Sequence, residues 1–327
     1  MKESWIVIVN VYAASKKAGS MWRKAERLLK EYGVDYQCRL TGAEGNACQL
    51  AYAASAEGFR RIVAVGGDGT VHDVLNGIMQ YVDTPEAAAA GGTLDEFTLG
   101  VLPMGSGNDW IRSTGVPKKM SAAIALLASG SFIQQDVVKA SLLDTDGSVR
   151  SVSYMANIGG VGIDADVCRV VNVNKKLGYR GKILYVKALL YHIIHRVPSF
   201  ARVICDGKKV FEGSYVSMAL GIGKYSGGGM RQTPEAVMDD GLLDLTIIPE
   251  LPMSIIARKV PKLFTGKFHT VRQLVLSRSR SIVVVPYDEA LPCAAVPGDP
   301  VEVDGEVVGH APVKFEIVPS QLNILTL

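Results

Sequence analysis

The sequence feature that most restricts the fold is a glycine-rich loop between an apolar, β-branched run and a helix-like segment. The run at 61–65 leads into Gly66-Gly67-Asp68-Gly69-Thr70, and the pattern over 71–81 is that of an amphipathic helix. Glycines let a backbone approach a phosphate group closely, and the first turn of a helix adds free N–H groups and the positive end of a dipole. The loop therefore predicts phosphate binding at the carboxyl end of a strand, in preference to a plain tight turn.

A second loop of the same kind follows the next strand-like run, at 98–102. It reads Gly105-Ser106-Gly107-Asn108-Asp109, with two glycines, a hydroxyl, an amide and a carboxylate. By itself this sequence is also good turn chemistry. Paired with the first loop, where Asp68 can hold Mg²⁺ on nucleotide phosphates and Thr70 adds a hydroxyl, it favours a nucleotide site.

The strand and helix patterns divide the chain into two parts. Up to residue 137, β-branched runs alternate with amphipathic segments, which predicts an α/β domain with a parallel sheet covered on both faces. Residues 138–311 read as short strands separated by turns, with one helical stretch at 181–196, which predicts a β-rich, sandwich-like second domain. The β-like residues 312–327 are expected to rejoin the first domain.

Composition excludes several classes of protein. The 35 basic and 32 acidic residues leave a net charge of only +3, so no global field favours nucleic acid. The five cysteines form no C-x-x-C pair, which indicates a reduced, cytoplasmic setting. No run reaches the ~18 apolar residues of a membrane span, and the first residues lack a signal-peptide pattern.

The two loops together resemble the diacylglycerol kinase catalytic domain of bacterial soluble lipid kinases, a superfamily that includes sphingosine and ceramide kinases. The resemblance extends over almost the whole chain and includes the glycine-rich segment 157–164. It implies a phosphofructokinase-like nucleotide-binding domain, with ATP and Mg²⁺ as cofactors. By position, it assigns nucleotide binding to the following residues: Asn10, Lys17, Thr41, Gly66, Gly67, Asp68, Gly69, Thr70, Gly105 and Ser106.

The resemblance also implies the residues that carry the chemistry. Glu306, in Val303-Asp304-Gly305-Glu306, stands in the place of the general base that accepts the hydroxyl proton, while Asp68, Asp109 and Asp136 would orient the metal or the acceptor. In some members a stretch like 233–244 binds a structural Mg²⁺. Here Asp240 would ligate it through its side chain, and Val237 and Leu242 through backbone carbonyls. An Asp-Gly hairpin without a metal explains the stretch equally well.

The expected reaction is transfer of the γ-phosphoryl group of ATP to a lipid hydroxyl, with diacylglycerol giving phosphatidic acid as the leading case. The acid-free tracts between Asp166 and Asp206 and between Glu250 and Asp288 carry eight and seven basic residues, together with apolar and aromatic ones. Such a surface favours peripheral contact with the inner face of the cytoplasmic membrane, although a solvated basic face is nearly as good an interpretation.

Two other functions remain open at the level of sequence. An NAD kinase shares the Gly-Gly-Asp-Gly loop and a β-rich second domain, but its Thr-Pro-Thr-Gly-Ser-Thr-Ala-Tyr segment is missing here. A catalytically silent lipid- or nucleotide-binding protein is disfavoured because Asp68, Asp109 and Glu306 are all present. Exposed strand edges in the second domain make a homodimer reasonable.

Overall fold

A computed structural model describes residues 4–12, 18–42, 45–105, 107–176, 182–195, 199–259, 261–287 and 298–326. Of the expected nucleotide-binding residues, Lys17 and Ser106 lie outside the described residues. The chain divides into two compact units, the first made of Met1–Val137 and Pro319–Leu327 and the second of Val138–Val318. Each is described here by itself.

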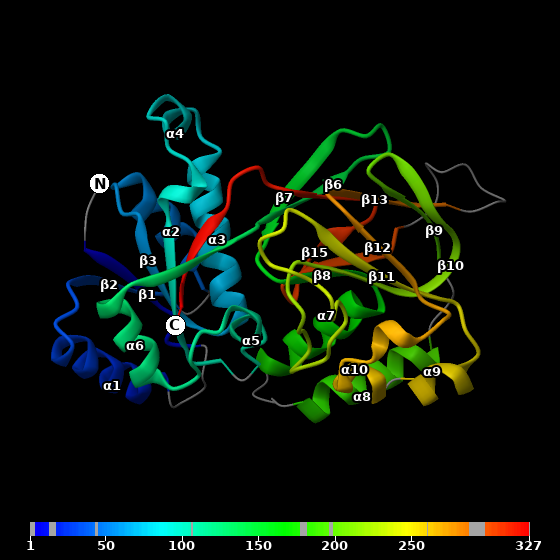
Figure 1. The fold of residues 1–327 in the computed structure, drawn as a ribbon, viewed down its shortest axis with the longest axis horizontal. Coiled ribbons are helices and arrows are strands. Elements are labelled where there is room, and N and C mark those ends of the chain that lie inside the picture. The colour runs from blue at the N-terminus through cyan, green and yellow to red at the C-terminus, as the bar shows by residue number, and fades with distance from the viewer. Residues whose placement is uncertain are drawn as a thin grey trace. The chain divides into compact units, whose positions relative to one another are not determined.

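The first unit is built on a six-stranded sheet in the order β2-β1-β3-β4-β17-β5 (Figure 1). All neighbours pair in parallel except β17 and β5, which are antiparallel. Its central strands β1 and β3 are apolar and buried except for Arg61 at the start of β3, as expected of a parallel sheet covered by helices on both faces. The strands are β1 (Trp5–Val9), β2 (Tyr36–Leu40), β3 (Arg61–Gly66), β4 (Thr98–Pro103), β5 (Ser131–Gln135) and β17 (Leu322–Thr326).

Helices cover this sheet on both faces. Apolar side chains of α1 and α6 pack on one face in a single buried cluster with β1, β3 and β4. The closely packed pair α2 and α3 includes Gly77, where a Cβ would lie only 2.2 Å from the carbonyl oxygen of Cys48. The helical segments of this unit are α1 (Ala18–Glu31), α2 (Ala47–Ala56), α3 (Asp68–Val82), α4 (Pro85–Ala89), η2 (Leu94–Glu96), α5 (Trp110–Thr114) and α6 (Met120–Ser129).

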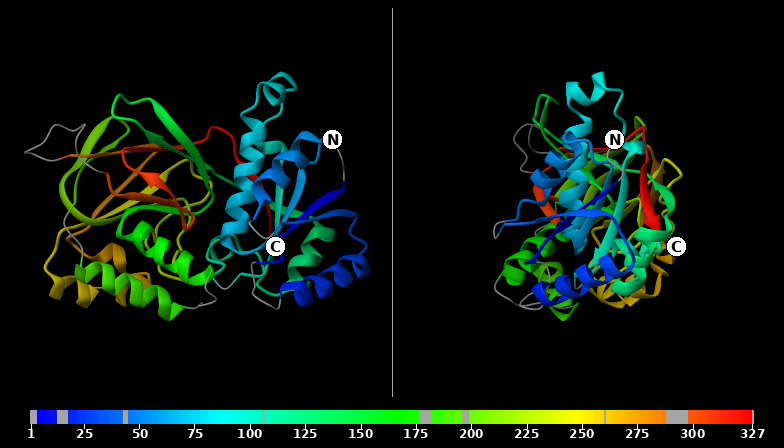
Figure 2. Two further views of the ribbon diagram at one scale, coloured as in Figure 1. Left: turned by 180° about the vertical axis from the view of Figure 1, so that it is seen from behind. Right: turned by 90° about the vertical axis from the view of Figure 1, so that its left-hand side faces the viewer.

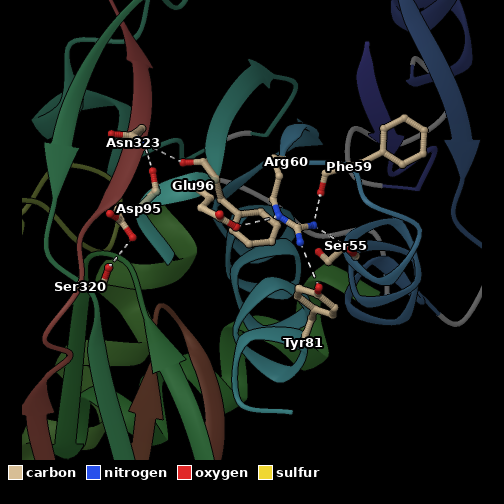
Figure 3. A network of polar contacts seen from close by, with 9 residues as sticks. Ser55, Phe59, Arg60, Tyr81, Asp95, Glu96, Ser320 and Asn323 are labelled. Carbon is tan, nitrogen blue, oxygen red and sulfur yellow. Dashed lines mark hydrogen bonds and ion pairs between the residues drawn. The ribbon is translucent and has the colours of Figure 1, made fainter. Parts of the chain in front are cut away.

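A half-buried arginine connects several of these elements at the beginning of β3 (Figure 3). The Arg60 guanidinium donates to the Tyr81 hydroxyl at 3.0 Å and to the carbonyl oxygen of Ser55 at 2.8 Å, and pairs with Glu96 at 3.3 Å. It also lies 4.7 Å from the centre of the Phe97 ring. The guanidinium therefore ties α2, α3 and η2 to the sheet.

We expect Arg60→Ala to destabilise the first unit by about 1–3 kcal/mol, because it leaves the buried carbonyl of Ser55 and the Tyr81 hydroxyl without their donor and removes the pair with the partly exposed Glu96. Lys30→Ala, at a highly exposed ion pair with Glu26, should cost less than about 1 kcal/mol. The three tryptophans, Trp5, Trp22 and Trp110, all belong to the first unit, so urea unfolding followed by their fluorescence measures it alone. Equal shifts for the two variants would contradict this account.

The second unit is built on an eleven-stranded sheet in which every described pairing is antiparallel. Its main path runs β15-β14-β8-β10-β9-β13-β16-β6-β7, and β11 joins β10 to β12. Buried apolar residues of these strands form its main core. The strands are β6 (Val138–Leu143), β7 (Val149–Met155), β8 (Ile158–Gly162), β9 (Ser199–Cys205), β10 (Lys208–Gly221), β11 (Leu243–Pro249), β12 (Val275–Ser279), β13 (Ser281–Pro286), β14 (Pro300–Val303), β15 (Glu306–His310) and β16 (Val313–Ile317).

This unit contains more helix than the single stretch that the sequence predicted. Besides α8 (Lys182–His195) it has α7 (Ile163–Lys176), α9 (Met253–Lys259), α10 (Pro261–Thr265) and the 3₁₀ turn η3 (Phe268–Thr270). The glycine-rich segment that precedes α7 concealed its start, and Pro261 limits α9 and α10 to lengths too short to show a helical period. Figures 1 and 2 show α8, α9 and α10 together in one layer. No helix in the described part of the chain is long and apolar enough to cross a bilayer.

The fold class predicted from the sequence, an α/β domain followed by a β-rich one, is confirmed. The expectation that residues 312–327 return to the first domain is wrong for 312–318. β16 pairs with β13 and β6 in the second sheet, and only β17 joins the first sheet, between β4 and β5. Both segments have β-type sequences, so local pattern alone could not assign them to different sheets.

Candidate functional site

The two glycine loops of the first unit are joined by main-chain hydrogen bonds. The carbonyl oxygen of Gly66, at the end of β3, accepts from the N–H of Met104 at 2.7 Å and of Gly105 at 3.1 Å, just after β4. A Cβ on Gly105 would lie 2.5 Å from the Cα of Gly67, so the two backbones touch at these glycines. Because such a contact excludes any side chain, the loops form one continuous surface at the carboxyl ends of β3 and β4.

Two further predicted nucleotide residues, Asn10 and Thr41, lie at the same edge of the sheet. Asn10 follows β1 and donates from Nδ2 to the Thr70 hydroxyl at 3.2 Å. Thr41 follows β2, its N–H donates to the carbonyl oxygen of Val9, and it is buried. Its hydroxyl has no hydrogen-bond partner among the described residues, as expected of a group that receives a ligand.

Gly66 itself has no room for a side chain, because a Cβ there would lie 2.2 Å from the Thr70 hydroxyl oxygen. Gly67 precedes α3 as its N-cap residue, and Asp68 and Gly69 form the first turn of that helix. The loop therefore presents helix N–H groups at a surface without bulky side chains, which suits an anion such as a phosphate group.

The carboxylates of Asp68 and Asp109 are brought near each other across the second loop. A Cβ on Gly107 would lie 3.1 Å from Asp68 Oδ2 and 3.7 Å from Asp109 Oδ2, so these two oxygens are within about 7 Å of each other. Asp68 Oδ1 accepts from the backbone N–H of Trp110 at 3.1 Å, and Asp109 Oδ1 pairs with Arg112 at 3.1 Å. Each carboxylate is thus fixed through one oxygen, with the other facing Gly107, an arrangement that fits a hard divalent cation carried by a nucleotide.

Trp110 links Asp68 to Gln135, the residue next to Asp136, which is the third predicted carboxylate. Its indole N–H donates to the side-chain oxygen of Gln135 at 3.0 Å, and Asp136 follows directly. Asp136 is buried, and its Oδ1 accepts from Nε2 of Gln321, at the start of the returning C-terminal segment, at 2.7 Å. In the described contacts Asp136 therefore joins the two chain segments of the first unit, 1–137 and 319–327. Its catalytic role stays a prediction.

In the second unit, Asp304-Gly305-Glu306 forms the tight turn between β14 and β15. Asp304 and Gly305 have φ of 53° and 88°, the left-handed pair that a two-residue hairpin requires. The Asp304 carboxylate accepts from the N–H groups of Ala156 and Asn157 at 2.8 and 2.9 Å, which fixes the turn to the segment before β8. Glu306 is the first residue of β15, its side chain is exposed, and Oε2 accepts from Asn172 Nδ2 of α7 at 3.2 Å.

Behind this turn lies a buried carboxyl group, Glu302, that the sequence did not single out. Its Oε2 accepts from the N–H of Gly305 at 2.7 Å. Burial raises the pKa of Glu302 well above its usual value, and the nearby carboxylates of Asp164, Asp304 and Glu306 raise it further. The hydrogen bond from the Gly305 N–H acts in the opposite direction and lowers this pKa. Gly160 makes room for it, because a Cβ there would lie 3.1 Å from Glu302 Oε1.

The raised pKa predicts a pH dependence of stability. Folding favours the protonated form of Glu302, so stability is highest below its unfolded pKa of ~4.3 and falls as the pH rises through the folded pKa. Glu302→Gln should flatten that decline, whereas Glu302→Ala should cost about 1–3 kcal/mol by leaving the Gly305 N–H without an acceptor. Calorimetry between pH 5 and 8 measures both effects, and an unchanged slope in Glu302→Gln would refute the assignment.

The residues predicted to hold a structural Mg²⁺ do not fit a cation in this arrangement. One oxygen of Asp240 accepts from the Leu242 N–H at 3.1 Å, and the other pairs with Arg278. Arg278 also pairs with Asp244 at 3.0 Å and opposes the rise that burial causes in the pKa of Asp244. The guanidinium therefore supplies the positive charge at this turn, and among the described residues no three metal-binding side chains cluster. The predicted Mg²⁺ ligands Val237, Asp240 and Leu242 therefore take no part in the proposed reaction.

The second unit also contains an apolar recess between its sheet and its helices. Strands β10 and β11 line one wall, and α7, α8, α9, α10 and η3 the others. The space not filled by atoms is about 730 Å³, with open solvent at its mouth included, and 14 of the 19 lining residues are apolar.

Three buried polar residues of the recess are hydrogen-bonded together at one end, whereas Lys259 lies apart from them on α9. At that end Asp164 accepts from the Ser217 hydroxyl at 2.7 Å and from Gln232 Nε2 at 2.9 Å, and all three are buried. A Cβ on Gly160 would lie 3.0 Å from the Asp164 Cβ and 3.1 Å from Glu302 Oε1, so this end adjoins the residue behind the Asp304-Gly305-Glu306 turn.

Sequence reasoning missed four residues that organise the site. Arg112 lies three residues after Asp109, a spacing that would have revealed the pair had the short α5 been recognised. Trp110, Asn172 and Glu302 act through contacts between residues distant in sequence, and no local pattern indicates those.

Comparison with known proteins gives two family matches that together cover most of the chain. Residues 4–140 match the diacylglycerol kinase catalytic domain. Residues 157–326 match the YegS C-terminal NAD kinase beta sandwich-like domain.

Individual relatives are similar over almost their full length. Proteins named "Probable lipid kinase YegS-like" are 28% identical in Stenotrophomonas maltophilia (98% of this chain, 95% of that protein) and 29% identical in Pseudomonas aeruginosa strain UCBPP-PA14 (92% and 88%). Among solved structures, a diacylglycerol kinase from Bacillus anthracis superposes with a TM-score of 0.69 at 21% identity, covering 99% of this chain and 97% of that one. At that identity the structural likeness shows the fold.

Proposed function

Because the chain belongs to the diacylglycerol kinase catalytic-domain family and carries a YegS-type C-terminal domain, we propose that it transfers the γ-phosphoryl group of ATP to a lipid hydroxyl. Diacylglycerol, giving phosphatidic acid, is the first candidate acceptor. The observation that carries the lipid assignment is the apolar recess in the second unit, whose polar end adjoins the turn that bears Glu306. A recess lined mainly by aliphatic side chains suits hydrocarbon chains rather than a nucleotide.

In the proposed reaction the acceptor oxygen bonds to the γ-phosphorus, the bond to the β-phosphate oxygen breaks, and ADP leaves. The hydroxyl proton passes to the Glu306 carboxylate, which Asn172 and the rigid hairpin hold in place. The glycine loops bind and orient the nucleotide phosphates, with Asn10 positioning Thr70. Mg²⁺ bound with ATP would neutralise phosphate charge, and Asp68 and Asp109 would hold it.

NAD kinase activity is the second candidate, because the C-terminal family is described as NAD kinase-like. The composition of the recess argues against it: 14 apolar lining residues and one buried polar end offer few partners for a second nucleotide. A protein that binds lipid without catalysis is disfavoured by the fixed geometry around Asp68, Asp109 and Glu306.

Glu306→Gln should lower phosphoryl transfer by about 10²–10⁴-fold while leaving ATP affinity within about twofold, because the amide cannot accept the hydroxyl proton. Glu212→Gln, a surface carboxylate paired with Arg202, is the matched control and should keep full activity. Labelled-phosphate transfer and ATP titration measure the two properties. A folded Glu306→Gln that loses ATP binding, or that keeps wild-type turnover, would overturn the base assignment.

Ile256→Trp should fill part of the recess and raise the KM for a long-chain diacylglycerol about tenfold or more, with little effect on a dibutyryl analogue. Leu276→Trp, at an exposed site on β12 outside the recess, is the control. Equal effects of Ile256→Trp on the long and short acceptors would show that the recess does not hold the chains.

A further inference from the structure

The helices that wall the apolar recess also carry an unusual outer surface. On α8, one stripe at helical spacing consists of Lys187, Leu190, Tyr191, Ile194 and His195, and all five are exposed. The opposite stripe of the helix, with Leu189 and Ile193, faces the recess. Large apolar side chains therefore point away from the core, with Tyr191 59% and Ile194 63% exposed.

The neighbouring helical segments add more exposed apolar and basic side chains. Phe264 on α10 is 43% exposed, and Lys267 and Arg272 are exposed just after it. Leu189 and Phe268, which belong to the same acid-free tracts, are buried and do not contribute to this surface. We call the exposed side chains of Lys187, Leu190, Tyr191, Ile194, Phe264 and Lys267 the helical face.

The charge of this layer has one sign. Neither α8 nor the segment 251–279 contains an acidic residue. Acidic side chains approach the segment in two described places: Asp240 and Asp244 pair with Arg278 at its end, and Glu235 lies 3.6 Å from His269 in η3. By contrast, Val149 on β7 is 58% exposed, and Asp144 and Asp146 lie in the adjoining turn. Apolar side chains interspersed with unopposed cations fit an anionic lipid surface rather than an acidic protein or bulk water.

We propose that the helical face docks on anionic bilayers, so that the recess behind it takes up its lipid from the membrane surface. The recess reaches the exterior at α9, where Ile255, Ile256 and Lys259 line it and are each partly exposed. The rims of the recess and the helical face thus belong to the same layer of helices (Figure 2). This inference rests on the proposed lipid kinase function, and it specifies the surface through which the acceptor is reached.

Vesicle flotation tests the proposal with the full-length protein. The wild type should float with vesicles of phosphatidylcholine and phosphatidylglycerol, much less with phosphatidylcholine alone, and less as salt is added. The double variant Tyr191→Ser/Ile194→Ser should lose tenfold or more in partitioning, and each of Lys187→Gln and Lys267→Gln roughly fivefold. Val149→Ser and Lys208→Gln, at exposed positions of β7 and β10, are the matched controls and should float as the wild type does.

Activity on a short-chain diacylglycerol in detergent separates docking from catalysis. The Tyr191→Ser/Ile194→Ser variant should keep that activity and lose activity on vesicles. Unchanged flotation of this variant would overturn the docking surface while leaving the kinase proposal intact. If the variant loses self-association in sedimentation but floats as the wild type does, the helical face is a contact between copies of the chain, and the docking proposal is again overturned. If the wild type phosphorylates no lipid yet floats through the helical face, the kinase proposal fails and the docking surface stands.

Discussion

The contact between Gly67 and Gly105 is the constraint on which the rest of the first unit's site depends. Their backbones touch, and the Gly66 carbonyl oxygen accepts two N–H groups from the opposite loop. A methyl group at either glycine would force the loops apart. Because the loops are fixed to each other, Asp68 can hold Trp110, and Trp110 in turn reaches Gln135 beside Asp136. The surface of the glycine loops and the carboxylates beside it are thus positioned by one small main-chain arrangement.

In the second unit, the hairpin turn before β15 holds the exposed side chain of Glu306, the proposed base. This turn is stabilised from below by Glu302, whose carboxyl group accepts the Gly305 N–H, and from the side by Asp304, which binds two main-chain N–H groups before β8. Gly160 is small so that Glu302 can lie on the strand. Strand β8, which contains Gly160, leads into α7. This helix carries Asp164, which lines the recess, and Asn172, which donates to Glu306. The apolar recess and Glu306 are therefore supported by the same strand and helix.

The sequence was informative where chemistry is local and less so where it depends on tertiary contacts. Glycine loops after β-branched runs predicted the edge of the sheet at which Asn10, Thr41 and Gly66–Thr70 gather, because parallel strands end at one edge. It could not assign β16 and β17 to different sheets, since both have β-type sequences and neither pattern specifies a partner strand. Arg278 beside Asp240 was equally invisible, because the two come together only through the pairing of β11 with β12. Glu302 looked like an ordinary strand residue until its burial was known.

The most direct test of the central claim is transfer of labelled γ-phosphate from ATP, with Mg²⁺, to diacylglycerol, phosphatidylglycerol, sphingosine and ceramide in mixed micelles, with NAD as a parallel acceptor. A lipid kinase should label at least one lipid. Asp68→Ala should label none while its tryptophan fluorescence shows a folded first unit. Labelling of NAD alone, or equal lipid labelling by the wild type and Asp68→Ala, would contradict the account.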